Sequence, residues 1–220
     1  MEVNNSANTV ISIQVSLSGY SFNGEWLGGE KVFSTPEFQK RYPSVEISLL
    51  TPKFTLVPDR FFTPGKEREI LGKVCRLGDE DVVESVPVPW YSAQLVFSPT
   101  IGESLSAVIA RTVLPESGQP ARVLPEMYYL LRELGKIGEY NKIAASWRDG
   151  FLHLAIATGD NLRLSNVFRA PDFTTAQYFI FLSLHQLQLN PQLSTVCFRT
   201  PLEKQDVLSL YRYVKGVVQL

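Results

Sequence analysis

The stretch that decides the fold is KIAASWRDGFLHLAIATGDNLRLSNV, residues 142–167. Its apolar and β-branched residues form three runs, which are separated by the turn signals Asp149-Gly150 and Gly159-Asp160. An Asp-Gly pair between two such runs is among the strongest local signs of a β-hairpin. The stretch therefore predicts a meander of three antiparallel strands, at residues 142–147, 151–157 and 161–167.

Helices and strands are expected to alternate after this meander. Asp172 precedes a long apolar segment as an N-cap, and Asn190-Pro191 ends the predicted helix near residue 189. Residues 194–198 predict a strand, 202–213 a helix and 216–220 a short final strand. The order β-β-β-α-β-α-β is that of a ribonuclease-H-like unit, whose antiparallel meander continues into right-handed parallel crossovers.

The first half of the chain opens in a similar way. Residues 10–17 (VISIQVSL) alternate like a strand, Ser18-Gly19 supplies a tight turn, and residues 20–26 predict the returning strand. A short third strand is expected at 30–33, and Thr35-Pro36-Glu37 is expected to begin a short helix. Further strands are predicted at 45–50, 53–57, 82–88 and 94–97, and further helices at 66–76, at 101–110 and from Pro125 onward.

Two such units in tandem describe the actin-like fold. We therefore predict an α/β protein of two ribonuclease-H-like lobes in tandem, with mixed sheets and helices on their faces. Residues 114–121 (LPESGQPA) hold two prolines and a glycine, which is typical of a linker. The predicted first lobe covers residues 1–113, which is short for such a pair and suggests a trimmed lobe, and the second covers 122–220.

Composition excludes several classes of protein. With 45% hydrophobic and 20% charged residues, the 220-residue chain has the composition of a globular protein rather than a disordered one. Its net charge of -1 does not indicate the basic surface of a nucleic-acid-binding protein. The first residues lack the pattern of a signal peptide and no apolar run is long enough to span a membrane, so we expect a cytoplasmic protein.

Side chains that carry chemistry are scarce. Cys75 and Cys197 lie in apolar segments and are predicted to be buried free thiols, with a single cross-link as the alternative. No Cys/His cluster predicts a metal site, and His153 and His185 have no partner at a known catalytic spacing, so no catalytic residue is assigned. A ribonuclease-H-type nuclease is excluded, because the predicted strands at 10–17, 142–147 and 194–198 contain no carboxylate to hold metal ions.

Three stretches resemble an uncharacterised bacterial family, the domain of unknown function 3822. They are SLSGYSF at 16–22, KFTLVPDRFF at 53–62, and LRLSNVF at 162–168 with the following Asp172, Tyr178 and QLQLNP at 186–191. That family looks like a member of the actin-like ATPase superfamily, so the resemblance implies a fold without an established activity. Relatives by fold, such as the cytoplasmic actin-like components of type IV pilus and type II secretion machines, act as assembly platforms.

The resemblance also implies where a nucleotide would bind. The first hairpin of an actin-like ATPase normally carries an aspartate that organises magnesium and water, and a glycine beside the amides that hold phosphate. The turn at Ser18-Gly19 keeps the glycine and lacks the aspartate, whereas the second turn offers Asp149 and Gly150, a pair that a plain hairpin also explains. Arg199 stands where the adenosine side normally has a glycine pair, and it is placed either to contact an anion or to be solvated.

Two functions remain in view. The preferred prediction is a non-catalytic actin-like interaction or assembly protein with a degenerate nucleotide cleft, no cofactor and an unidentified protein partner. Its contact patch is predicted at Trp90 and Tyr91, which follow two prolines that stiffen the segment, although core packing also explains these aromatics. The alternative is a nucleotide-binding protein that holds Mg-ATP through Gly19, Asp149 and Gly150, with at most weak ATPase activity.

Overall fold

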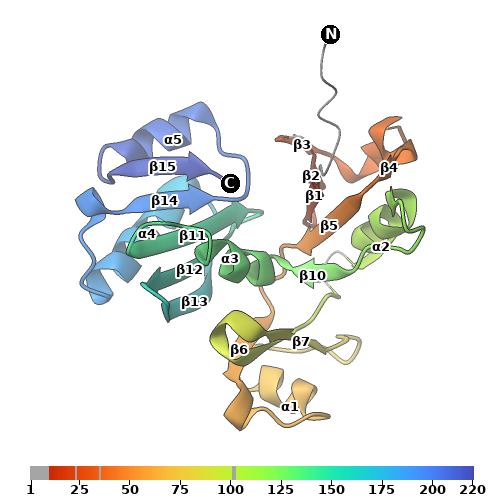
Figure 1. Ribbon diagram of the computed structural model, residues 1–220, viewed down its shortest axis with the longest axis horizontal. Helices are drawn as coiled ribbons and strands as arrows, with labels where there is room; N and C mark the ends of the chain where they lie inside the picture. The colour runs from red at the N-terminus through yellow and green to blue at the C-terminus, as the bar shows by residue number, and fades with distance from the viewer. Residues whose placement is uncertain (1–9, 23, 35, 101–102) are drawn as a thin grey trace.

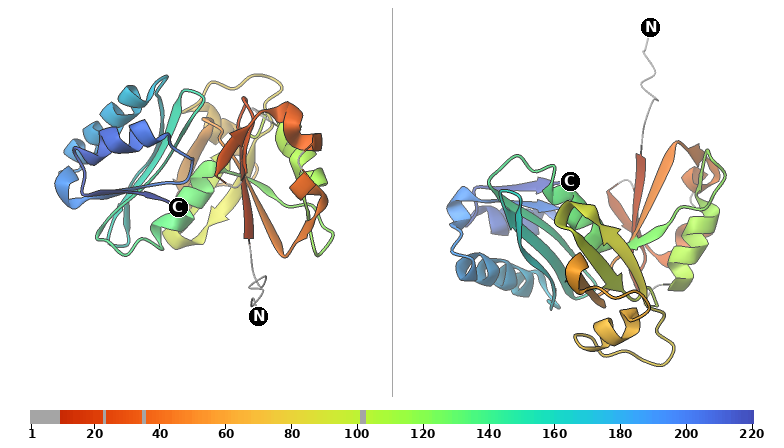
Figure 2. Two further views of the ribbon diagram at one scale, coloured as in Figure 1. Left: turned by 90° about the horizontal axis from the view of Figure 1, so that it is seen from above. Right: turned by 60° about the horizontal axis from the view of Figure 1, so that its bottom comes forward.

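The computed structural model describes residues 10–22, 24–34, 36–100 and 103–220 (Figure 1). This part of the chain folds as a mixed α/β protein with two five-stranded sheets, one three-stranded sheet and one two-stranded pairing. Figure 2 shows the two five-stranded sheets on opposite sides of the molecule, with the helix of residues 126–134 between them. The mixed sheets and the helices that cover them confirm the predicted α/β class.

The first five-stranded sheet has the strand order β10-β5-β1-β2-β3. The strand β2 is antiparallel to β1 and β3, whereas β5 is parallel to β1 and to β10. Apolar residues of β1, β5 and α2 form the core on one face of this sheet, which explains the alternating pattern of VISIQV. The elements are β1 (Val10–Val15), β2 (Tyr20–Phe22), β3 (Glu25–Leu27), β5 (Ser44–Leu49), β10 (Val123–Pro125) and α2 (Glu103–Thr112).

Two predictions for this sheet are wrong. The single strand expected at 20–26 is two short strands, β2 and β3, with Gly24 at a positive φ of 78° between them. The strand expected at 30–33 is instead the 3-10 helix η1 (Gly29–Ser34), because the third strand of the meander has already formed upstream. The short helix expected from Thr35 is the 3-10 helix η2 (Pro36–Gln39), and Thr35 itself lies outside the described residues.

The second five-stranded sheet has the order β13-β12-β11-β14-β15. Counted along the chain, its strands take the same places and directions as those of the first sheet, with three antiparallel strands followed by two parallel ones. The structure confirms the predicted order of elements in this half. They are β11 (Asn141–Arg148), β12 (Phe151–Thr158), β13 (Asn161–Arg169), α4 (Phe173–Gln186), β14 (Thr195–Phe198), α5 (Lys204–Tyr211) and β15 (Gly216–Gln219).

The third sheet is small and three-stranded. Its strands were predicted from the sequence, but not that they form a separate sheet. Its order is β6-β8-β7, with both outer strands antiparallel to β8. It interrupts the chain between β5 and α2, and Figure 1 shows it below the two larger sheets. Its elements are β6 (Phe54–Pro58), η3 (Asp59–Phe61), α1 (Glu67–Gly72), β7 (Glu84–Val88), η4 (Pro89–Tyr91) and β8 (Ala93–Phe97).

The predicted linker at 114–121 begins as a strand. The strand β9 (Leu114–Pro115) pairs in parallel with β4 (Arg41–Tyr42), and the amide of Glu116 donates to the carbonyl of Tyr42 at 2.7 Å. The start of this segment is therefore tied to the elements around the first sheet. A Pro-rich stretch read from composition alone does not reveal such a pairing, because a parallel partner is distant in sequence.

The helix α3 (Glu126–Leu134) is the centre of the molecule (Figures 1 and 2). Met127, Leu130, Leu131 and Leu134 are fully buried in it and pack between the three-stranded sheet and one face of the second five-stranded sheet. The opposite face of that sheet packs against α4 and α5. Because β10 runs directly into α3, the first residue of the helix, Glu126, lies where the two large sheets approach each other.

His153 is one of the buried links between the two halves of the chain. It lies in β12 with no exposed surface, and its Nε2 is 2.9 Å from the carbonyl oxygen of Thr51, so Nε2 carries the proton. No hydrogen-bond partner for Nδ1 occurs among the described residues. Burial lowers the pKa of His153 below its ordinary value, although Thr51 and the charge of Glu126 act in the opposite direction.

This lowered pKa predicts a loss of stability in mild acid. The unfolded chain takes up a proton at His153 below about pH 6.5 and the folded chain does not, so the free energy of unfolding falls as the pH falls. Between pH 7.5 and 5.5 we expect His153 to contribute a loss of at most about 1 kcal/mol. Urea unfolding at both pH values measures it, with His153→Gln as the matched variant. An equal loss in that variant would assign the pH dependence to other groups.

Candidate functional site

The two hairpin turns that were predicted as nucleotide loops contact each other. The amide nitrogen of Ser18 donates to Oδ2 of Asp149 at 3.0 Å, and the Ser18 hydroxyl donates to Oδ1 at 2.6 Å. Asp149 and Gly150 have positive φ values of 51° and 77°, which is the geometry of an ordinary two-residue hairpin. The donors and the acid that would face a nucleotide phosphate and its magnesium are therefore bonded to one another.

The charge of Asp149 is stabilised by these contacts. Burial would raise the pKa of its carboxyl group, but hydrogen bonds from Ser16 and Ser18 and the charge of Arg148 outweigh burial and hold the pKa below its ordinary value. The carboxylate therefore stays ionised, and the stability that it contributes is present above about pH 4 and lost as the pH falls further. The ionised state keeps the contact with Ser18 closed at neutral pH.

A double-mutant cycle should detect this contact as a coupling between the two turns. Ser18→Ala and Asp149→Asn each remove part of the pair, and Asn preserves the left-handed turn conformation. We expect a coupling energy of about 1 kcal/mol in the free energy of unfolding, measured by urea titration at pH 7.5. Full additivity of the two substitutions would mean that the bond between the Ser18 hydroxyl and Asp149 does not stabilise the fold in solution.

Gly19, the predicted phosphate-binding glycine, is required by the packing of its own sheet. Its φ is 151°, and a Cβ atom built on it would lie 2.0 Å from the carbonyl oxygen of Leu27. Leu27 ends β3, the neighbouring strand of β2, so the backbone of β3 occupies the place of a side chain. The glycine is thus explained by a close approach of two strands, without any ligand.

A buried polar cluster fills the space where β1, α3 and β11 meet. Its centre is Glu126, which has no exposed surface. Its Oε1 accepts from Gln14 of β1 at 2.9 Å and from the Ser146 hydroxyl of β11 at 2.6 Å. Its Oε2 is 2.6 Å from a guanidinium nitrogen of Arg199. With both oxygens engaged by donors, the carboxylate is a fixed acceptor rather than a ligand that is open to solvent.

Arg199 joins the second sheet to the first. It follows β14, its own amide donates to Ala145 of β11 at 2.9 Å, and its side chain is 8% exposed. Beyond the ion pair with Glu126, its guanidinium donates to the Ser12 hydroxyl of β1 at 3.0 Å and lies 4.8 Å from the ring centre of Tyr129. Of the two placements that the sequence left open, solvation does not describe Arg199, and its charge is neutralised by Glu126.

A second cationic contact continues the same interface. Arg132 of α3 donates to both carboxylate oxygens of Glu46 in β5, at 2.6 and 2.7 Å, and lies 5.0 Å from the ring centre of Tyr129. Tyr129 is buried, and burial raises the pKa of its hydroxyl well above the ordinary value. Its hydroxyl donates to the carbonyl of Ile47 at 3.3 Å. This bond is a second contact between α3 and β5, beside the one from Arg132 to Glu46.

Two small cavities flank this cluster, and we call them together the cleft. One holds about 340 Å³ and is lined by residues that include Arg132, Lys136 and Arg199. The other holds about 150 Å³ and lies between β1 and the residues after β14. Ser12, Arg199 and Leu220 line both cavities, so the arginine that pairs with Glu126 borders the cleft.

The predicted contact patch lies elsewhere. Trp90 and Tyr91 form η4 at the end of β7, where Trp90 is 47% exposed and Tyr91 is half-buried. The Trp90 ring lies 5.4 Å from that of Tyr128 on α3. A cavity of about 370 Å³ runs between these aromatics and Asp160 at the turn before β13. The structure thus leaves Trp90 accessible beside a hollow, whereas Tyr91 contributes to packing.

The sequence did not single out Glu126, Gln14 and Ser146, although they form the centre of the site. Glu126 follows Pro125 at the start of an apolar helix, where an acid is ordinary because it favours the helix dipole. Gln14 and Ser146 are the buried polar residues of β1 and β11, and a polar residue among apolar ones in a strand was the available signal. A buried polar side chain needs a hydrogen-bond partner, and here Gln14 and Ser146 both find theirs in Glu126.

Metal and membrane sites find no support in the part of the chain that the structure describes. No group of three or more His, Cys, Asp or Glu side chains is arranged there to hold a metal ion. No helix within the described ranges is long and apolar enough to cross a membrane. Cys197 is buried and Cys75 is half-buried; both are free thiols whose pKa is raised by burial, so the predicted burial is wrong for Cys75.

Comparison with known proteins supports the fold. Residues 29–217 match the family described as protein of unknown function (DUF3822). A Bacteroides thetaiotaomicron protein with an actin-like ATPase fold and unknown function is similar over 100% of this chain and 93% of its own, with a TM-score of 0.67 and 16% identity. No curated protein sequence matches the chain.

Two further solved structures are similar at lower scores. The PilM–PilN type IV pilus biogenesis complex contains a chain that aligns over 96% of this one and 88% of its own, with a TM-score of 0.54 and 13% identity. The cytoplasmic domain of EpsL, an inner-membrane component of the type II secretion system of Vibrio cholerae, aligns over 89% and 83% with a TM-score of 0.48 and 15% identity. At these identities the likeness concerns the fold.

Proposed function

This chain belongs to the family described as protein of unknown function (DUF3822), and we propose that it is a non-catalytic actin-like interaction or assembly protein. One observation carries the proposal: the groups that would hold a nucleotide are engaged with each other. Ser18 is bonded to Asp149, and Arg199 is bonded to Glu126. A nucleotide would have to break both contacts and leave buried charges without partners, which is costly.

The same proposal assigns the architecture. The two five-stranded sheets form the cores of two ribonuclease-H-like lobes in tandem. The sequence placed the first lobe at 1–113, the connection at 114–121 and the second lobe at 122–220, but β10 (Val123–Pro125) belongs to the first sheet, so the first lobe extends to residue 125 and the second begins with α3. The identical strand order and directions of the two sheets support this division. The three-stranded sheet is an insertion in the first lobe, since it lies in the chain between two elements of that lobe. The cleft then lies between the lobes, and we place the protein in the cytoplasm.

A protein partner is favoured over a small ligand. The similar pilus biogenesis structure is a complex of PilM with PilN, so at least one chain of this fold works in contact with another protein. In the present chain the Trp90 side chain is exposed next to a hollow, and tryptophan is enriched where proteins bind one another. The surface around Trp90 and Tyr91 is the proposed contact patch for that partner.

Titration with Mg-ATP tests the proposal. We expect no shift of the melting temperature at millimolar nucleotide, with or without magnesium, and no heat in calorimetry. A ligand at 100 times its dissociation constant would stabilise the folded chain by about 2.7 kcal/mol and raise its melting temperature by roughly 5–10 °C. The Ser18→Ala, Asp149→Asn double variant is the matched control with an opened turn. A magnesium-dependent rise in the unmodified chain would instead establish the nucleotide-binding alternative.

A further inference from the structure

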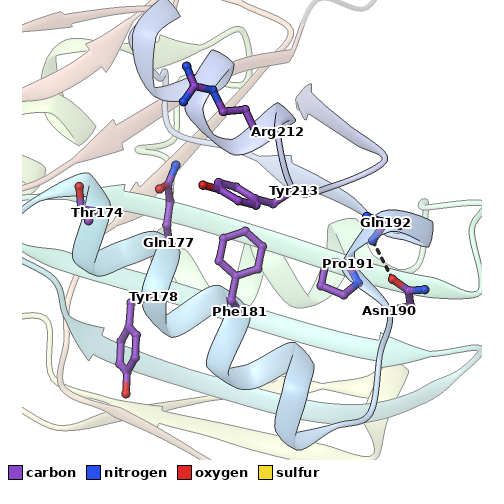
Figure 3. Close-up of a pocket in the computed structure, with 9 residues that line it drawn as sticks. All are labelled: Thr174, Gln177, Tyr178, Phe181, Asn190, Pro191, Gln192, Arg212 and Tyr213. Atoms are coloured by element: carbon purple, nitrogen blue, oxygen red, sulfur yellow. Dashed lines mark hydrogen bonds between the residues drawn. The ribbon is translucent and has the colours of Figure 1, made fainter.

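A groove lies on the outer face of the second sheet, away from the cleft (Figure 3). It runs between α4, the last turn of α5 and the 3-10 helix η5 (Pro191–Leu193), and it holds about 500 Å³. Figure 3 shows Gln177 and Phe181 of α4 pointing toward Tyr213, with Pro191 on the far side of the groove. The Phe181 and Tyr213 rings meet edge to face with their centres 5.5 Å apart, so the groove has an aromatic floor.

A second hollow continues the groove along α5. It holds about 550 Å³ and is lined by residues of that helix, among them Lys204, Leu208 and Arg212. Arg212 lines both hollows, and a hydrogen bond from the Gln177 amide to the Ser209 hydroxyl holds α4 against α5 between them. We call these two neighbouring hollows together the α4–α5 groove.

The side chains that line the α4–α5 groove include two cations and no acid. Among the described residues, neither Lys204 nor Arg212 forms an ion pair. Acids are not scarce in the chain, which carries 22 acidic and 21 basic residues. Glu203 and Asp206 flank Lys204 at the start of α5, whereas Arg212 follows the other end of the helix, and no acid lines the hollow between α4 and Arg212. An unpaired arginine beside an apolar floor favours an occupant that brings a carboxylate.

The apolar part of the groove is accessible. Tyr213 is 55% exposed and Leu208 is 57% exposed, although each lies next to other apolar side chains. Tyrosine and arginine are among the side chains that most often dominate binding at protein interfaces. Tyrosine offers a large apolar surface and arginine a bidentate donor, and each loses little conformational entropy when it binds. The α4–α5 groove combines both types within one hollow.

We propose that the α4–α5 groove binds a short acidic and hydrophobic segment of a partner protein. A carboxylate of the segment pairs with Arg212, and a neighbouring aliphatic or aromatic side chain packs on Phe181 and Tyr213. This inference rests on the proposed function, because it names the kind of partner for a chain that works through protein contacts.

Peptide display tests the assignment. A library of random 12-residue peptides is selected on the immobilised full chain, and the enriched peptides are synthesised and titrated by fluorescence anisotropy. We expect peptides with Asp or Glu beside an aromatic or aliphatic residue. Arg212→Glu and Tyr213→Ala should each weaken their binding about tenfold or more, and Arg212→Lys should weaken it less. Arg111→Glu is the matched control, since Arg111 is an exposed arginine in the last turn of a different helix.

The outcomes separate this inference from the proposed function. Enriched peptides without acidic residues, binding that survives both Arg212→Glu and Tyr213→Ala in variants with unchanged circular dichroism, or no enrichment at all would overturn the groove assignment. Peptides that are lost with Trp90→Ala but not with Arg212→Glu would overturn it while the interaction function stands. A dimer of the unmodified chain that Arg212→Glu converts to a monomer would make the occupant a second copy, which also contradicts the proposal. Mg-ATP binding would contradict the proposed function alone.

Discussion

Replacing Glu126 by alanine is expected to lower the free energy of unfolding by about 3–5 kcal/mol. The substitution removes the acceptor of three donors at once and leaves the Arg199 guanidinium, which is 8% exposed, without its counter-charge. Gln14 and Ser146 are 4% and 0% exposed and lose their acceptor too. A buried cation without a partner costs far more than the pair itself contributes, because the protein interior does not replace the lost hydration.

Thermal and urea unfolding measure this effect. For a chain of this size a loss of 3–5 kcal/mol corresponds to a fall of the melting temperature by roughly 6–20 °C. Glu69→Ala is the matched control, because Glu69 pairs with Lys66 and Lys73 on the surface and its removal should leave the melting temperature unchanged within error. Replacing Glu126 and Arg199 together by methionine should cost less than the sum of the single changes. If Glu126→Ala unfolds like the control, the cluster does not hold the sheets together.

Replacing Gly19 by alanine is the second large effect, with an expected loss of about 3 kcal/mol. The new Cβ would lie 2.0 Å from the carbonyl oxygen of Leu27 and 3.2 Å from the Cα of Gly28, and both are backbone atoms. A flexible side chain can move away from such a contact, but here the edge strand β3 itself has to shift. The φ of 151° adds a conformational cost, since residues other than glycine avoid it.

Gly24→Ala distinguishes the clash from the conformational cost. Gly24 has a positive φ of 78° in the same sheet, and a Cβ built on it meets nothing within 4 Å. It should therefore lose only about 1 kcal/mol in the same urea titration. Equal losses in the two variants would show that the approach of Leu27 is not what requires a glycine at position 19. A Gly19→Ala chain as stable as the unmodified one would remove the structural explanation altogether.

The second half of the fold was predicted almost element by element. The two turns at Asp149-Gly150 and Gly159-Asp160 lie between β11, β12 and β13, and Asp172 caps α4 through a 2.8 Å bond to the amide of Thr175. Such signals are local: a turn residue or a cap acts on its own neighbours in the chain. Where local signals were strong, the predicted bounds differ from the structure by few residues.

The first half was predicted less well, because its decisive contacts are distant in sequence. The 3-10 helix η1 was mistaken for a strand, since Val32 and Phe33 are apolar and β-branched or aromatic in a short run. The strands β6, β7 and β8 were recognised individually, but their separation into a third sheet was not. Strand pairing is a tertiary property, so a correct list of strands does not divide them among sheets.

The candidate site shows the same division. The sequence pointed to Asp149 and Arg199 as unusual charges near predicted loop ends, and the structure places both at contacts between the two halves of the chain. It did not indicate that Ser18 would donate hydrogen bonds to Asp149, or that Glu126 would pair with Arg199. These partners are separated by 131 and 73 residues. The sequence of a loop shows which residues it contains, but not which distant side chains pair with them.

What the sequence by itself determined is the set of local elements, the α/β class and the resemblance to an actin-like family, because propensity, capping and turn chemistry act over a few residues. What only the tertiary structure decided is whether the loops are open to a ligand. The stretch Lys142–Val167 predicted a meander. It left open whether Asp149 at the first turn serves a nucleotide site or only a hairpin turn. The acceptance of two hydrogen bonds from Ser18, and the burial of Glu126 against Arg199, follow from how two distant sheets approach each other around α3. Charges buried by that approach must be paired, and Glu126 and Arg199 pair with each other.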